Sequence, residues 1–140
     1  MSGPTGHDVA MEPTGEQLAA LHASGDAGPV VMLNLLRFKD RATGIDAADG
    51  ITGAEAYGRY GVHAQRFLAG AGGRVLHTLS PHESVIGPVP GEWDLVLVVE
   101  YPSRQAFLAM ISDPDYLAIH EHRAAGLADS RLIACSSLTA

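Results

Sequence analysis

The 140-residue chain is poor in cysteine, in basic residues and in long apolar runs. Its one cysteine, Cys135, excludes an intramolecular disulfide and a cysteine-rich zinc site. Nine Lys and Arg against 16 Asp and Glu give a formal charge of −7, and such an acidic surface repels the phosphates of nucleic acids. The apolar segments 30–36 and 95–99 are far shorter than the ~20 residues that cross a bilayer. With no apolar signal-peptide core in the first dozen residues, we expect a cytoplasmic protein without nucleic-acid or membrane partners.

Hydrophobic residues nevertheless make up 46% of the chain, which is too high a fraction for a disordered protein. A length of 140 residues suits one domain, and a domain of this size needs no disulfide or metal to fold. Residues 1–13 are rich in glycine and proline and are expected to form a flexible tail. The sequence thus predicts a single domain over residues 14–140.

Capping residues and hydrophobic periodicity divide this domain into helices and strands. Helices are expected from a cap at Thr14 to about 25, around 55–71, after a cap at Ser103, and from Asp113-Pro114 to about 126. Strands are expected at 30–38, 74–80, 93–101 and 131–138, with 84–86 continuing the sheet. In the second helix, Glu55 and Arg59 are spaced i,i+4 as a favourable ion pair. Residues 39–53 form a loop of a length that is often functional or mobile.

The order of elements is a leading helix followed by β-α-β-β-α-β, which predicts an α+β, ferredoxin-like fold. Its antiparallel sheet carries the helices on one face and leaves the other face bare. Strands 30–38 and 93–101 are apolar at both parities, so the bare face is apolar too and requires a partner. We therefore expect two copies to pack sheet against sheet as a dimeric α+β barrel.

Two polar residues of the first strand are candidate ligand-binding groups. Asn34 interrupts the most apolar strand; its amide either orients a ligand in a cavity between the paired sheets or fastens a bulge or a neighbouring backbone. Arg37 has the opposite parity, so without a bulge it does not share a pocket with Asn34. Arg37 is either an anion-binding group at the mouth of the barrel or a surface partner of an acidic neighbour.

Further candidates lie on the helices. Tyr60, like Tyr57, occupies the apolar arc of its helix, as a core residue or as a proton donor. At 100° per residue, Tyr116, His120 and Arg123 share one stripe of the helix after Pro114. This pattern indicates a pocket in which Tyr116 contacts the ligand, His120 acts as acid, base or hydrogen-bond donor, and Arg123 holds a carboxylate or enolate oxygen. The alternative is an Arg123 that lays its stem on the core and pairs with a carboxylate.

Many segments of the chain resemble an uncharacterised family known as domain of unknown function 1330: residues 29–38, 53–60, 72–74, 93–94, 100–103, 106–107, 113–116, 122–123 and 129–133. The resemblance covers roughly residues 13–135 and implies a dimeric α+β barrel without an established activity. It favours His122 together with Arg123, so the choice between His120 and His122 stays open. Related barrels include cofactor-free monooxygenases, isomerases, dehalogenases and haem-degrading proteins, a relation of fold alone.

These residues lead to a functional hypothesis of modest scope. We expect a homodimer that binds a small organic molecule, such as a carboxylate or an aromatic compound, with cofactor-independent chemistry as an option. The alternative is a structural or regulatory homodimer without a ligand. Metal- or haem-dependent chemistry would require a histidine directed into the cavity, and the seven histidines show no recognisable ligand spacing. No metal and no cofactor are therefore predicted.

Overall fold

The computed structural model describes residues 12–24, 27–89 and 91–139, so nearly all of the predicted tail lies outside the described residues. The elements, in order, are α1 (Gly15–Ala23), β1 (Val30–Phe38), the 3₁₀ helix η1 (Gly44–Asp49), α2 (Gly53–Gly70), β2 (Arg74–Leu79), β3 (Leu95–Tyr101), α3 (Arg104–Ser112), α4 (Pro114–Gly126) and β4 (Leu127–Cys135). Among the described helices, none is long and apolar enough to cross a membrane.

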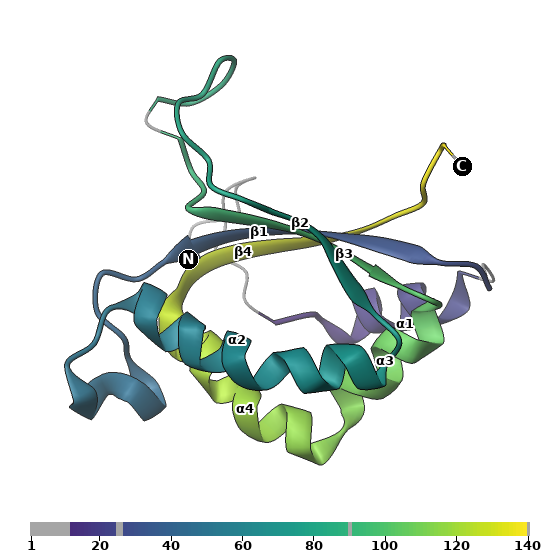
Figure 1. The fold of residues 1–140 in the computed structure, drawn as a ribbon, viewed down its shortest axis with the longest axis horizontal. Coiled ribbons are helices and arrows are strands. Elements are labelled where there is room, and N and C mark those ends of the chain that lie inside the picture. Colours follow the sequence, from purple (N-terminus) through teal and green to yellow (C-terminus); the bar gives the residue numbers. More distant parts are fainter. Residues whose placement is uncertain (1–11, 25–26, 90, 140) are drawn as a thin grey trace.

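The four strands form one antiparallel sheet in the order β2-β3-β1-β4, and the helices lie on one side of it (Figure 1). This β-α-β-β-α-β connectivity is the ferredoxin-like α+β arrangement, so the predicted fold class is confirmed. β1 is central and pairs with both β3 and β4. The central strand therefore presents its residues to the middle of the helical layer, where a site is best enclosed.

The helix boundaries follow the capping signals in the sequence. Thr14 and Gln17 form a capping box at α1, and Thr52 forms another at α2. The Ser103 and Asp113 side chains accept hydrogen bonds from the first turns of α3 and α4. These capping side chains determine where each helix begins, because they accept hydrogen bonds from backbone N–H groups that a helix leaves unpaired at its start.

Parts of the strand prediction are wrong. Residues 84–86 do not continue the sheet; they belong to the segment 80–89, which rises on the side of the sheet opposite the helices (Figure 1), and Val85 and Ile86 are 92% and 96% exposed. β4 begins at Leu127, not at residue 131, because the chain passes from α4 directly into the strand, and it ends at Cys135. Leu127 is fully buried beneath the helices, and its burial stabilises the first residues of β4 in the strand conformation.

The two faces of the sheet differ in what covers them. Val30, Met32 and Leu36 of β1 are buried against the helices. Residues of opposite parity, such as Leu33, point away from the helices; Leu33 pairs with Val98 of β3 and Ile133 of β4. The predicted apolar pattern on both faces is thus present in the structure.

Helices α2 and α4 approach each other closely at one glycine pair. A Cβ on Gly126 would lie 2.9 Å from the Tyr57 nitrogen and still closer to the Gly53 carbonyl oxygen. Backbone hydrogen bonds fasten the same junction to the end of β1: the Lys39 N–H donates to the Gly126 carbonyl and the Gly53 N–H donates to the Lys39 carbonyl. This junction sets the spacing of the two helices that carry most of the candidate site residues.

Candidate functional site

A cavity of about 880 Å³ lies between the helix-covered face of the sheet and the helices. Its walls are mainly apolar. They are formed by the sheet and four helices: α1 (Leu18, Leu21), the sheet (Met32, Val99), α2 (Tyr60), α3 (Phe107, Met110) and α4 (Tyr116, Leu117). The volume falls in the range of about 300–1,000 Å³ that is usual for small-molecule sites. Helix α1, which has no buried residue, is the most lightly packed wall.

A polar cluster stands inside this apolar cavity. The hydroxyl oxygens of Tyr60 and Tyr116 lie 2.7 Å apart in a hydrogen bond. The His120 ring contacts both tyrosine rings, with centroids 6.4 Å from Tyr60 and 5.8 Å from Tyr116. Asn34 and Arg123 line the same cavity. The structure thus brings together five of the residues that the sequence singled out.

Burial sets the protonation of this cluster. Burial raises the pKa of the Tyr60 and Tyr116 hydroxyls, so both remain protonated and able to donate at neutral pH. Burial also lowers the pKa of His120; the Arg123 charge lowers it further, while Glu12, with Oε1 3.5 Å from His120 Nδ1, acts in the opposite direction. The imidazole is therefore neutral at pH 7, and it can accept or donate a hydrogen bond.

The cavity is more positive than the protein as a whole. Besides Arg131, whose guanidinium turns to Asp129 and to the Trp93 ring, its charged lining residues are Arg104 and Arg123 against Glu12, in a chain of formal charge −7. Arg131 is paired with Asp129, its Nη1 lying 2.7 Å from Oδ1. Arg104 and Arg123 are 9% and 8% exposed. Such guanidinium groups, set in an apolar enclosure, suit a carboxylate or an enolate oxygen.

Asn34 lies on the helix-covered face of the sheet, not on the bare face. The predicted position of its amide, between paired sheets, is therefore wrong; both parities of β1 are apolar, and the sequence did not reveal which one the helices cover. The Asn34 Oδ1 atom is buried and has no hydrogen-bond partner among the described residues. A bulge follows at Arg37/Phe38, beyond Asn34, so it is not what the amide fastens.

Arg37 does not line this cavity. Its Nε donates to the Glu92 carbonyl oxygen at 2.8 Å, and its guanidinium lies 5.7 Å from the centre of the Trp93 ring. Arg131 approaches the same ring at 5.5 Å. The structure therefore separates Arg37 from Asn34, as their opposite parity predicts, and gives Arg37 a backbone and an aromatic partner rather than an acidic one.

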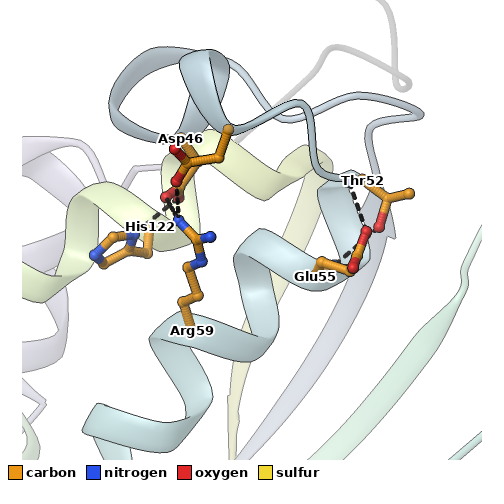
Figure 2. A network of polar contacts seen from close by, with 6 residues as sticks. Asp46, Thr52, Glu55, Arg59 and His122 are labelled. Carbon is orange, nitrogen blue, oxygen red and sulfur yellow. Dashed lines mark hydrogen bonds and ion pairs between the residues drawn. The ribbon is translucent and has the colours of Figure 1, made fainter.

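His122 is not among the residues that line the cavity; it belongs to a separate network that joins α4 to η1 and α2 (Figure 2). Its Nδ1 lies 2.8 Å from Oδ2 of Asp46, a carboxylate of η1 that is 1% exposed. Arg59 of α2 donates to Oδ1 of Asp46 at 2.7 Å and also bonds to Asp49. Thus His120, and not His122, borders the cavity, and Asp46 ties η1 to both α2 and α4.

Opposing effects act on the Asp46 carboxyl. Burial by itself would raise its pKa, but the hydrogen bonds and charges of His122 and Arg59 together lower the pKa below its usual value. Arg59 was expected to pair with Glu55. Glu55 instead completes the capping box, accepting a hydrogen bond from the Thr52 N–H at 3.0 Å (Figure 2).

Sequence reasoning missed the contribution of α3 and of the segment around α1. Arg104 is the first residue of α3, three positions before Phe107 and seven before Ile111, and all three line the cavity. This i, i+3, i+7 spacing could have revealed Arg104. Nothing in the sequence indicates that Glu12 lies beside His120, because contacts between distant segments have no periodic signal. Among the described residues, no group of three or more His, Cys, Asp or Glu side chains could hold a metal ion.

Known structures share this architecture. A protein of unknown function from Rhodopseudomonas palustris, RPA0582, is 39% identical, with a TM-score of 0.88 over 95% of this chain and 100% of that one. A dabb family protein with a ferredoxin-like fold from Mesorhizobium loti is 16% identical (TM-score 0.52, 80% of this chain and 99% of that one). SnoaB, a cofactor-independent oxygenase from Streptomyces nogalater, is 13% identical (TM-score 0.53, 81% and 97%). These last two similarities concern the fold alone.

No protein of curated function matches the chain. The family described as Domain of unknown function (DUF1330) matches residues 46–136, which include α2, α3, α4 and most of the sheet. This match covers more than half of the sequence and contains four of the five polar residues of the cavity cluster. The chain therefore belongs to the DUF1330 family.

Proposed function

We propose that the protein binds a small organic acid with an aromatic or alicyclic body in the cavity beneath its sheet. The observation that carries this proposal is the convergence of Asn34, Tyr60, Tyr116, His120 and Arg123 on one apolar space of about 880 Å³. Apolar walls with a few convergent polar groups are the usual composition of a small-molecule site. The aromatic side chains suit a flat apolar body, because rings favour edge-to-face contacts.

Arg123 is the natural partner of the acid group. It is 8% exposed, it borders the same cavity as Tyr60, Tyr116 and His120, and its positive charge lowers the pKa of all three. A carboxylate bound there accepts charge-assisted hydrogen bonds, which are stronger than neutral ones. Beside it, a neutral imidazole can exchange a proton with a bound molecule, and two protonated hydroxyls can donate hydrogen bonds to it. Any chemistry at this site would then use side chains alone.

Replacing Arg123 by methionine should weaken binding of an aromatic acid about tenfold or more, because one partner of a desolvated charge pair is removed. The probe is 2-naphthoate, and the measurements are its dissociation constant and the rise in melting temperature that it causes. Arg66→Met is the matched control: Arg66 is an exposed arginine of α2 that stacks on Phe67 outside the cavity. An equal loss in both variants, or no binding to the unaltered protein, contradicts the proposal. Absorption spectra and metal analysis of the purified protein check for haem or metal beforehand.

We also propose that the uncovered sheet face pairs with a second copy of the chain. Leu33, Val98 and Ile133 form an apolar row across this face, and Ile133 is 47% exposed. The segment 80–89, with exposed Val85 and Ile86, rises on the same side of the sheet (Figure 1). Exposed apolar residues gathered on one face favour an interaction site there. A homodimer without any ligand is the alternative function, and it shares this interface.

Leu33→Glu should convert a dimer into a monomer, because it places a charge in the centre of the uncovered face. Sedimentation velocity at micromolar concentration measures the change. Val62→Glu provides the control, since Val62 is 71% exposed on α2, away from the sheet face. If the unaltered protein already sediments as a monomer, the interface does not exist.

A further inference from the structure

The Asn34 amide has an unusual place in the sheet. Across the strands it lies opposite Leu97 of β3 and Leu132 of β4, and along β1 its neighbours on the same face are Met32 and Leu36. All four are apolar. Oδ1 is buried, and within the described ranges no donor reaches it. An acceptor in this state has lost its hydration without gaining a hydrogen bond, which destabilises the folded protein.

The position of Asn34 at the cavity gives this unpaired oxygen a use. Asn34 is one of the lining residues. Because no donor holds Oδ1, the amide can turn about its terminal bond, whose rotation is broad in asparagine, and present the oxygen to the cavity. A donor carried by a bound molecule would then satisfy it. The amide oxygen is thus suited to accept a hydrogen bond from an O–H or N–H group of the ligand. A ligand that carries no such donor leaves the oxygen unpaired.

The charge of the cavity decides which kind of donor fits. An ammonium group would meet the positive charges of Arg104 and Arg123, with Glu12 as the one acidic residue among the described lining residues. A neutral hydroxyl avoids this repulsion. Resting on the proposed function, we propose that the ligand is a hydroxy acid: its carboxylate lies at Arg123 and its hydroxyl donates to Asn34 Oδ1.

Matched ligands test this inference. The panel consists of 2-naphthoate and its monohydroxy derivatives, each with the corresponding methoxy derivative, which keeps the oxygen and removes the hydrogen. Dissociation constants are measured for the unaltered protein and for Asn34→Leu, which has a similar volume and no polar atoms. At least one hydroxy acid should bind about tenfold more tightly than both its methoxy derivative and the parent acid, and Asn34→Leu should abolish this preference while still binding the parent acid.

The melting temperature without ligand provides an independent readout. If Asn34 serves recognition, Asn34→Leu should melt no lower than the unaltered protein, because it removes a buried unpaired acceptor. A lower melting temperature, an absent hydroxyl preference, or a preference that persists in Asn34→Leu overturns the inference and leaves the proposed function standing. If no acid of the panel binds the unaltered protein, the proposed function fails as well, and so the two failures are distinguishable.

Discussion

Asp46→Ala should lower the free energy of unfolding by about 3 kcal/mol, the lower end of the range for breaking a buried ion pair. The Asp46 carboxylate is 1% exposed and accepts from both Arg59 and His122, so its removal leaves the Arg59 guanidinium and the His122 ring without their common acceptor (Figure 2). Arg59 is 40% exposed and recovers part of its hydration, which keeps the loss from being larger. Denaturant titration followed by circular dichroism measures the change.

The same experiment has a defined pH dependence. The folded-state pKa of Asp46 lies below its usual value of 3.8, so the ionised carboxylate stabilises the fold. This contribution is complete above about pH 5 and is lost as the pH falls through 3.8 towards the lowered folded-state pKa. The difference in stability between the unaltered protein and Asp46→Asn should therefore shrink over that acidic interval. Asp49→Ala removes the exposed partner of Arg59 and should cost less than about 1 kcal/mol. Equal losses for Asp46→Ala and Asp49→Ala would contradict the structure.

Gly126→Ala should lower the free energy of unfolding by about 3 kcal/mol or more, at the upper end of overpacking effects. The added Cβ would lie 2.9 Å from the Tyr57 nitrogen and closer still to the Gly53 carbonyl oxygen. These neighbours are backbone atoms of α2 and cannot move aside as a flexible side chain can. Relief requires α2 and α4 to separate, which also displaces Tyr60 from Tyr116. Thermal unfolding measures the first effect, and the affinity for 2-naphthoate the second.

Gly58→Ala is the matched control for this substitution. Gly58 lies exposed within α2, and a Cβ there would meet nothing within 4 Å. The change should raise stability by about 0.5–1 kcal/mol, because alanine favours a helix over glycine. The same glycine-to-alanine substitution is thus expected to lower stability at Gly126 and to raise it at Gly58. A Gly126→Ala protein as stable as Gly58→Ala would show that the close junction does not exist.

The parts of the site that follow helix geometry could be predicted from sequence. Tyr116, His120 and Arg123 share a stripe because α4 is a regular helix whose start is fixed by Asp113 and Pro114. The periodicity also assigns His122 to another side, and the structure agrees, whereas the family resemblance favoured His122. Alternation along β1 likewise separates Asn34 from Arg37. In each case the prediction depends on one element and its period.

The parts that depend on contacts between elements could not be predicted. Sequence spacing pairs Arg59 with Glu55, but η1 brings Asp46 and Asp49 to Arg59, and a buried carboxylate offers a stronger partner than an exposed one. The sequence also did not indicate whether Asn34 lies on the helix-covered face of the sheet, since β1 is apolar on both sides. Only the packing of α1, α3 and α4 reveals that the cavity lies beneath the sheet rather than between two sheets.

The central claim is that an organic acid occupies the cavity with its carboxylate at Arg123. The most direct measurement is anomalous diffraction from crystals of the protein soaked with 6-bromo-2-naphthoate, in which bromine marks the position of the ligand. We predict a bromine peak inside the cavity bordered by Phe107, Met110 and Tyr116, with the carboxylate at Arg123. A bromine peak only on the uncovered sheet face, or a cavity filled by protein side chains, would contradict the account.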